Sequence, residues 1–254
     1  PWVVPSRALG GQGWRHLVIP MRCFAHAGDD FGAVTQAFRL ASSGTGRAAI
    51  ADLRFVPHAT GGIACPDYRT ESVTPRPLEQ VWSMDWWMPR HAEKLARIRQ
   101  AAAAHQPIDL VFVGDSITQN WEKDGQAVWA RHYAKYNALN LGFGGDHTEN
   151  VLWRLQHGAI DGISPKGVVM MIGTNNTGTC TAPDIAQGIT AIVQEFQKRL
   201  PQAKILLLGV FPRGEKPGPQ RDKIAEINQD ISKLNAPPRV TYLDIGLKFL
   251  IAEG

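Results

Sequence analysis

From residue 110 onward, short apolar runs alternate with longer amphipathic stretches. The runs cover residues 110–113, 138–141, 168–172, 205–210 and 240–243. They are apolar at nearly every position, as strands must be when helices cover both faces of a parallel sheet. Between them, residues 182–200 and 221–234 have the apolar period of helices, and another helix is expected to begin near Pro89, after an aromatic cluster at residues 81–87. This alternation predicts a three-layer α/β fold with a parallel sheet.

The beginning of the chain has a different pattern. Apolar residues bounded by glycine-rich turns predict strands at residues 16–23, 37–41 and 47–56. Residues 58–80 contain prolines, glycines and polar residues without a period. We therefore predict three parts: a short β-rich extension at residues 1–57, a linker at 58–80 and the α/β domain at 81–254.

Composition and charge narrow the possible functions. The chain has 254 residues, 44% of them hydrophobic and 20% charged, as in an ordinary globular protein. Its net charge of +4 comes from scattered basic residues, so we expect no nucleic-acid partner. No apolar run approaches the ~20 residues of a membrane span. Cys23, Cys65 and Cys180 lack the spacing of a metal site, which leaves either three thiols or one disulfide with one thiol.

Polar and glycine-rich segments follow the first three predicted strands of the sheet. They are Gly114-Asp-Ser-Ile-Thr118, Gly142-Phe-Gly-Gly-Asp146 and Gly173-Thr-Asn-Asn176. Because ligands bind beyond the carboxyl ends of parallel strands, we expect the three segments to meet at one edge. Ester hydrolysis needs a hydroxyl that attacks the carbonyl carbon and fixed donors that hold the oxyanion. Ser116 offers the hydroxyl and a backbone N–H. Gly144 and Gly145 let the backbone come close enough for an N–H to point at the oxyanion, and Asn175 offers a side-chain N–H.

These three segments resemble the first three sequence blocks of the SGNH, or GDSL-type, hydrolases. The likeness is strongest to the catalytic subunits of platelet-activating-factor acetylhydrolase and their bacterial relatives. It extends through Val151-Leu-Trp-Arg-Leu155 and Pro212-Arg-Gly-Glu-Lys-Pro217. The resemblance implies a flavodoxin-like sheet and hydrolysis of short acyl esters without a metal or other cofactor. It also implies that Ser116 is the nucleophile and that Ser116, Gly145 and Asn175 form the oxyanion hole.

A serine nucleophile also needs a base, usually a histidine oriented by a carboxylate. The histidines all precede the third strand of the sheet; they are His16, His26, His58, His91, His105, His132, His147 and His157. The resembled family carries an Asp-x-x-His segment after the last strand. Here Asp244 follows that strand, but residue 247 is a leucine. We expect a chain that ends before this segment; natural loss of the triad is the alternative.

Among the histidines present, His147 is the candidate for a substitute base that lies nearest to the glycine segment in sequence. A surface or helix-start position is the stronger expectation for it, and His132 is expected to be structural.

A second resemblance concerns the N-terminal piece. Residues 14–24 and 50–54 are similar to the end of the C-terminal β-sandwich of some bacterial family 3 exo-glucosidases. An esterase joined to a glucosidase would act on acylated polysaccharide, and such proteins are typically secreted or periplasmic. The alternative, given equal weight, is a β extension that packs on the hydrolase.

The sequence therefore predicts a serine-dependent carboxylic-ester hydrolase for short acyl groups, acetyl in particular, with carbohydrate as one possible carrier. A lipid or aryl esterase of the same fold is the second hypothesis. The third is a carbohydrate-binding protein that keeps the esterase fold without its base. The expected partner is an acyl-ester substrate, and a homo-oligomer is an open alternative.

Overall fold

The computed structural model describes residues 13, 14, 16, 18, 49–56 and 71–250. The chain divides into two compact units, Pro1–Thr70 and Glu71–Gly254. In the first unit, the strand expected at 47–56 is not formed over residues 49–56, which are exposed and have no regular structure. A strand needs a neighbouring strand for its backbone hydrogen bonds, and these residues have none among those described. The other two expected strands lie almost entirely outside the described residues.

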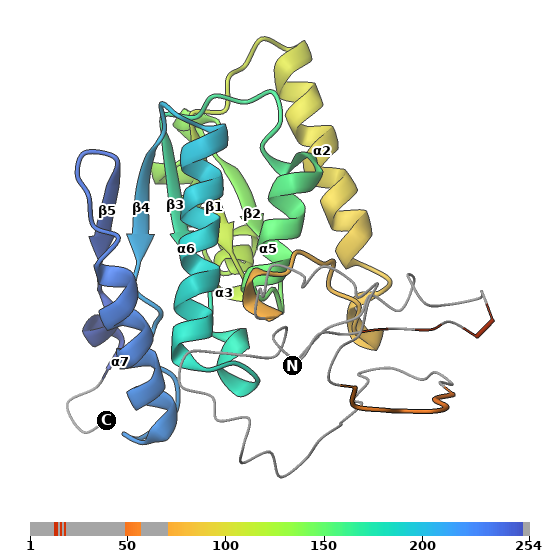
Figure 1. Cartoon of the computed structure of the whole chain (residues 1–254). Coiled ribbons are helices and arrows are strands. Elements are labelled where there is room, and N and C mark those ends of the chain that lie inside the picture. The colour runs from red at the N-terminus through yellow and green to blue at the C-terminus, as the bar shows by residue number, and fades with distance from the viewer. Residues whose placement is uncertain (1–12, 15, 17, 19–48, 57–70, 251–254) are drawn as a thin grey trace. The chain divides into compact units, whose positions relative to one another are not determined.

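The second unit is built on a five-stranded parallel sheet (Figure 1). Its strands are β1 (Leu110–Gly114), β2 (Leu139–Gly142), β3 (Gly167–Met171), β4 (Lys204–Leu208) and β5 (Val240–Leu243). Their order, β2-β1-β3-β4-β5, is that of flavodoxin-like folds. All five strands coincide with the apolar runs of the sequence, so the predicted fold class is confirmed. The carboxyl ends of β1, β2 and β3, and the segments that follow them, therefore meet at one edge.

Helices cover the two faces of the sheet. They are α2 (Trp87–Ala103), α3 (Ser116–Gln119), α4 (Gln126–His132), α5 (Thr148–Arg154), α6 (Ala182–Arg199) and α7 (Pro219–Ser232). Figure 1 shows α5, α6 and α7 along one side of the sheet. Val111 and Val113 belong to the main core, whereas Phe112 packs against Trp129 and Tyr133 of the α4 region. Alternate residues of a strand point to opposite faces, so β1 is covered on both sides.

Residues 71–80, which the sequence analysis assigned to a linker, pack within the second unit. The segment includes the 3₁₀ turn Glu71–Val73, and the carbonyl of Ser72 accepts a hydrogen bond from Thr148 at 2.7 Å. Leu78 is buried in a small cluster with Trp87 and Phe143. The sequence pattern did not predict this packing. The segment is rich in prolines and polar residues without a regular period, and contacts with distant residues hold it in place.

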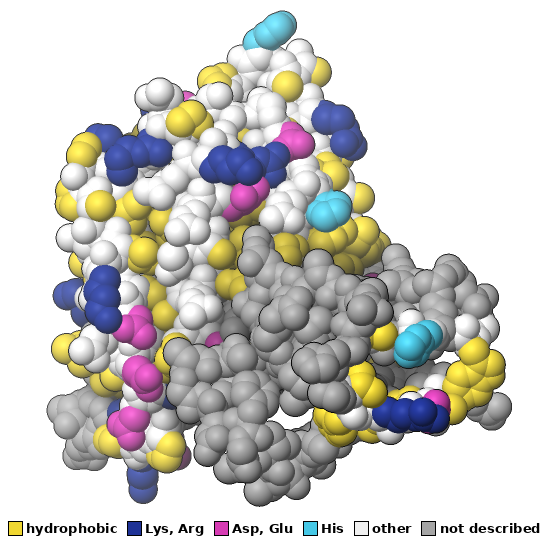
Figure 2. Space-filling model, viewed as in Figure 1, with side chains coloured by type: hydrophobic (Ala, Val, Ile, Leu, Met, Phe, Trp, Pro, Cys, Tyr) yellow, Lys and Arg dark blue, Asp and Glu magenta, His cyan; other side chains and the backbone are white. Residues whose placement is uncertain are grey.

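On the face shown in Figure 2, lysine and arginine side chains are scattered among acidic ones instead of forming one patch. No helix among the described residues is long and apolar enough to cross a lipid bilayer.

Candidate active site

Ser116 lies where β1 turns into α3. A side chain at Gly114 would come within 2.2 Å of Thr118 Oγ1, so the turn requires glycine there. Asp115 caps the helix, because its carboxylate accepts a hydrogen bond of 2.9 Å from the backbone N–H of Ile117. Ser116 is the first residue of the helix and is exposed. The turn thus presents a serine hydroxyl to solvent at the helix start.

The Asp115 carboxylate is an unusual cap because its side chain is fully buried. Its Oδ2 atom has no hydrogen-bond partner among the described residues. Burial raises the pKa of Asp115 to about 6, and the negative charge of Asp146 adds to the rise, whereas the hydrogen bond from Ile117 opposes it. The residue beside Ser116 therefore carries a charge that the folded protein disfavours.

The glycine segment after β2 approaches the same turn. Gly144 donates its backbone N–H to Gln119 Oε1 at 2.6 Å, and a Cβ placed on Gly144 would lie 3.9 Å from the Cβ of Ser116. Gly145 has a φ of +77°, and a Cβ there would lie 2.3 Å from the ring of Trp82. The N–H of Gly145 makes no hydrogen bond with any described residue. Of the two glycines, Gly145 has the N–H that remains available.

The neighbouring asparagines after β3 have different surroundings. Asn175 is half-buried and donates one N–H of its side chain to the backbone carbonyl of Asp146 at 2.9 Å. An amide nitrogen carries two hydrogens, so one N–H of Asn175 is left for another acceptor. Asn176 is fully buried, and its side chain bonds the backbone N–H of Thr148 and the carboxylate of Glu149. Asn175 therefore faces the site, while Asn176 holds α5.

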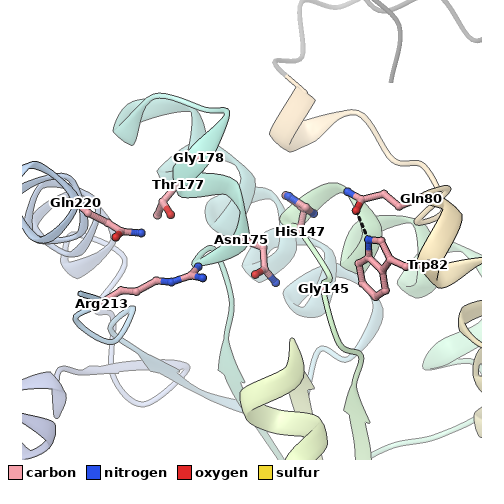
Figure 3. A pocket seen from close by; sticks show the side chains of 9 residues that line it. All are labelled: Gln80, Trp82, Gly145, His147, Asn175, Thr177, Gly178, Arg213 and Gln220. Atoms are coloured by element: carbon pink, nitrogen blue, oxygen red, sulfur yellow. Dashed lines mark hydrogen bonds between the residues drawn. The ribbon is translucent and has the colours of Figure 1, made fainter. Parts of the chain in front are cut away.

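A cavity of ≈ 450 Å³ lies beside these groups (Figure 3). Its lining residues are Gln80, Trp82, Gly145, His147, Asn175, Thr177, Gly178, Arg213 and Gln220. Two of the predicted oxyanion donors, Gly145 and Asn175, are thus on its wall. Ser116 does not line the cavity. It lies beside Gly144, and the next residue, Gly145, is on the cavity wall.

Several residues on the cavity wall were not predicted from the sequence. Trp82 belongs to the aromatic cluster at residues 81–87, and Arg213 belongs to the segment Pro212–Pro217; neither segment was predicted to line a cavity. The structure describes no hydrogen bond or ion pair of the Arg213 side chain with another described residue. Figure 3 shows this side chain extending toward Asn175. A basic residue inside the Pro212–Pro217 segment was the signal available in the sequence, and in the structure its charge opposes the rise in the pKa of Asp115.

The histidines divide clearly by their surroundings. His147 is the residue before α5 and lines the cavity. His91 is buried, with its Nε2 atom 3.0 Å from the carbonyl of His157, and His157 stacks on Trp153. His132, which was expected to be structural, is exposed in the last turn of α4, and its ring centroid lies 6.3 Å from that of Tyr133. Among the described residues, His147 is therefore the one histidine on the cavity wall.

Asp244 has no histidine partner in the described part of the chain. Its carboxylate accepts hydrogen bonds from the side chain of Asn228 and the backbone N–H of Gly246. Leu247, at the position three residues later, is 83% exposed.

Comparison with known proteins identifies the family. A family model described as GDSL-like lipase/acylhydrolase matches residues 112–254. The chain is 41% identical over 182 residues to platelet-activating factor acetylhydrolase IB subunit alpha2 of Rattus norvegicus, covering 71% of this chain and 76% of that protein. The chain belongs to the GDSL-like lipase/acylhydrolase family. The alpha1 subunit of Homo sapiens is 38% identical to this GDSL-family chain over 181 residues, covering 71% and 75% of the two proteins.

Solved structures support the same fold. A GDSL-like lipase from Bacteroides thetaiotaomicron superposes on the GDSL-family chain with a TM-score of 0.50 at 18% identity, covering 63% of this chain and 82% of that one. A Streptococcus pneumonia protein named after platelet activating factor gives a TM-score of 0.51 at 20% identity, covering 66% and 80%. A second family model, described as galactose-binding domain-like, matches residues 6–55 of the first unit.

Proposed function

We propose that this GDSL-family protein is a carboxylic-ester hydrolase in which Ser116 attacks the carbonyl carbon of a short acyl ester. The observation that carries this proposal is the convergence of Ser116, Gly145 and Asn175 at one sheet edge beside a cavity. Attack would form a tetrahedral intermediate, and its collapse would release the alcohol and leave an acyl group on Ser116. Water would then release the acid.

The oxyanion would be held by N–H groups that have no other acceptor among the described residues. The N–H of Gly145 has no partner among described residues, and the side chain of Asn175 has a second N–H to offer. The backbone N–H of Ser116 opens α3, where unpaired N–H groups point outward. Donors fixed in advance stabilise the charge that develops in the transition state without reorganising.

Acetyl is our proposed acyl group. The relatives at 41% and 38% identity are named as acetylhydrolases, which supports a short acyl group and also supports a lipid as its carrier. Carbohydrate as the carrier is supported by the polar cavity lining and by the galactose-binding-like match to residues 6–55. A lipid ester is therefore the second candidate substrate, and a direct comparison of carriers separates the two.

The base is proposed from the family pattern, in which a histidine of an Asp-x-x-His segment takes the proton of the serine. His147 is the alternative, because it lines the cavity. The third hypothesis, a binding protein with an esterase fold, requires that neither histidine serves Ser116.

The experiment is turnover of 4-nitrophenyl acetate by the full-length protein and by Ser116→Ala. Loss of a triad serine can lower turnover by ~10⁶, so we expect activity near the background rate. Ser164→Ala is the matched control, since Ser164 is an exposed serine in the loop before β3. Activity of Ser116→Ala within tenfold of the parent would contradict the proposal. Acetyl, butyryl and octanoyl esters, then acetylated xylose and an acetylated glycerolipid, would define the acyl length and the carrier.

A further inference from the structure

The last residue of the glycine segment, Asp146, has a buried carboxylate that accepts three hydrogen bonds. Asp146 is fully buried, and its Oδ1 atom accepts a hydrogen bond of 2.6 Å from the indole N–H of Trp87. Its Oδ2 atom accepts two hydrogen bonds from Arg154, from Nε at 2.9 Å and from Nη2 at 2.6 Å. Arg154 is also fully buried. Three donors from two helices thus fix one side chain.

The backbone of Asp146 belongs to the site itself. Its carbonyl accepts the hydrogen bond from the side chain of Asn175 at 2.9 Å, and this is the bond that orients the amide. Its N–H donates to the carbonyl of Phe143 at 3.1 Å and closes the turn that contains Gly144 and Gly145. The same residue therefore touches both segments from which the proposed oxyanion donors come.

The two side chains that hold Asp146 also hold the other end of this turn. The guanidinium of Arg154 lies 3.9 Å from the ring centroid of Phe143, and the ring of Trp87 meets the same phenyl ring edge-on at 5.7 Å. Phe143 and Asp146 flank the two glycines, so Trp87 and Arg154 brace the turn on both sides. Two glycines in succession are conformationally permissive, and such a turn keeps one shape only if its flanks are fixed.

We propose that Asp146 is a positioning residue for the oxyanion hole, acting through its side-chain bonds to Trp87 and Arg154. This inference rests on the proposed function. The bonds of Asp146 to Trp87 and Arg154, called the clamp below, hold both the N–H of Gly145 and the side-chain amide of Asn175 in position. A buried ion pair is a poor way to gain stability, because desolvation offsets most of the attraction, so we ascribe the pair in this protein to the geometry that its bonds fix. Oxyanion donors require such geometry, since they must lie about 2.7–3.1 Å from the developing charge.

The test is a double-mutant cycle on turnover with Trp87→Phe and Asn175→Ala in the full-length protein. Trp87→Phe keeps a ring against Phe143 but removes the N–H that holds Asp146. A misplacement of about 1 Å can cost ~10² in rate, so we expect kcat to fall about 10- to 100-fold with KM within about threefold. In the Asn175→Ala background, Trp87→Phe should lower kcat by less than a third of the factor seen in the parent. One of the two donors that Asp146 positions is already absent there.

Trp153→Phe is the matched control. The ring centroids of Trp153 and Trp87 are 5.5 Å apart, but the indole N–H of Trp153 makes no hydrogen bond with any described residue. We expect its kcat to stay within about threefold of the parent. Folding of each variant is checked by circular dichroism and urea unfolding. If Trp87→Phe does not fold, Arg154→Lys enters the cycle in its place, since it keeps the charge but loses the paired bonds to Oδ2.

The outcomes separate this inference from the proposed function. If the clamp variant lowers kcat by the same factor in both backgrounds, or no more than Trp153→Phe does, the residues around Asp146 are merely structural and the positioning role is wrong. That result leaves the assignment of Ser116 intact. If Asn175→Ala alone leaves kcat unchanged, the oxyanion role of Asn175 fails and the inference falls with it. A smaller factor in the Asn175→Ala background is the result we expect.

Discussion

Replacing Asp115 by asparagine should stabilise the protein at neutral pH. The carboxylate is fully buried, its Oδ2 atom has no partner among the described residues, and burial raises its pKa from the usual 3.8 to about 6. Asparagine is an equally good helix cap, so Asp115→Asn keeps the hydrogen bond to the N–H of Ile117. The substitution removes the charge and retains the shape.

The sign and size follow from proton linkage. A carboxyl whose pKa is higher in the folded state holds its proton more strongly there, so stability falls as pH rises from 3.8 through about 6. Each pKa unit is worth about 1.4 kcal/mol, so the folded parent loses about 1 kcal/mol at pH 4.5 and about 3 kcal/mol at pH 7.5. Asp115→Asn escapes this loss, and its advantage should grow by about 2 kcal/mol between the two pH values.

Urea unfolding of the parent and the variant at pH 4.5 and pH 7.5 measures this difference directly. Asp124→Asn, which changes an exposed aspartate, controls for the general effect of removing one negative charge. A difference between parent and Asp115→Asn that is the same at both pH values would refute the reasoning. So would a variant that is less stable than the parent at pH 7.5.

Three further changes probe the site. Asn175→Ala removes one proposed oxyanion donor, so kcat for an acetyl ester should fall by ~10²–10³ with little change in KM; a rise confined to KM would identify Asn175 as a substrate clamp. Gly145→Ala should lower kcat more than Gly178→Ala. Gly145 has a φ of +77° and a Cβ there would lie 2.3 Å from Trp82, whereas a Cβ at Gly178 would have no atom within 4 Å. Equal rates for the two variants would show that the turn at Gly145 tolerates a side chain. His147→Gln should change kcat less than tenfold if the base is the histidine of the family pattern; a loss above ~10³, with the acid limb of the pH–rate profile removed, would make His147 the base.

The sequence alone determined the architecture of the second unit. Its strands are apolar on both faces, and a parallel sheet covered by helices is the arrangement that buries such strands. The three polar segments follow β1, β2 and β3, so parallel pairing was sufficient to predict that they meet. The resemblance of these segments to the GDSL-type hydrolases singled out Ser116, Gly145 and Asn175 as site residues, and the experiments above test their roles.

Tertiary structure decided which neighbouring groups are free to act. Gly144 and Gly145 are alike in sequence, but Gln119 occupies the N–H of Gly144. Asn175 and Asn176 are alike as well, but Thr148 and Glu149 occupy Asn176. Those partners come from other elements, and contacts between distant parts of the chain leave no local period.

The same reason explains the residues that sequence analysis overlooked. Leu78 and its neighbours pack on the hydrolase unit although their prolines suggested a linker, and Trp82 and Arg213 reach one cavity from segments 131 residues apart in sequence. Asp146 showed no local sign of its burial, because Trp87 and Arg154 reach it from different helices. Local pattern fixes elements, while burial and hydrogen-bond partners depend on how the elements pack.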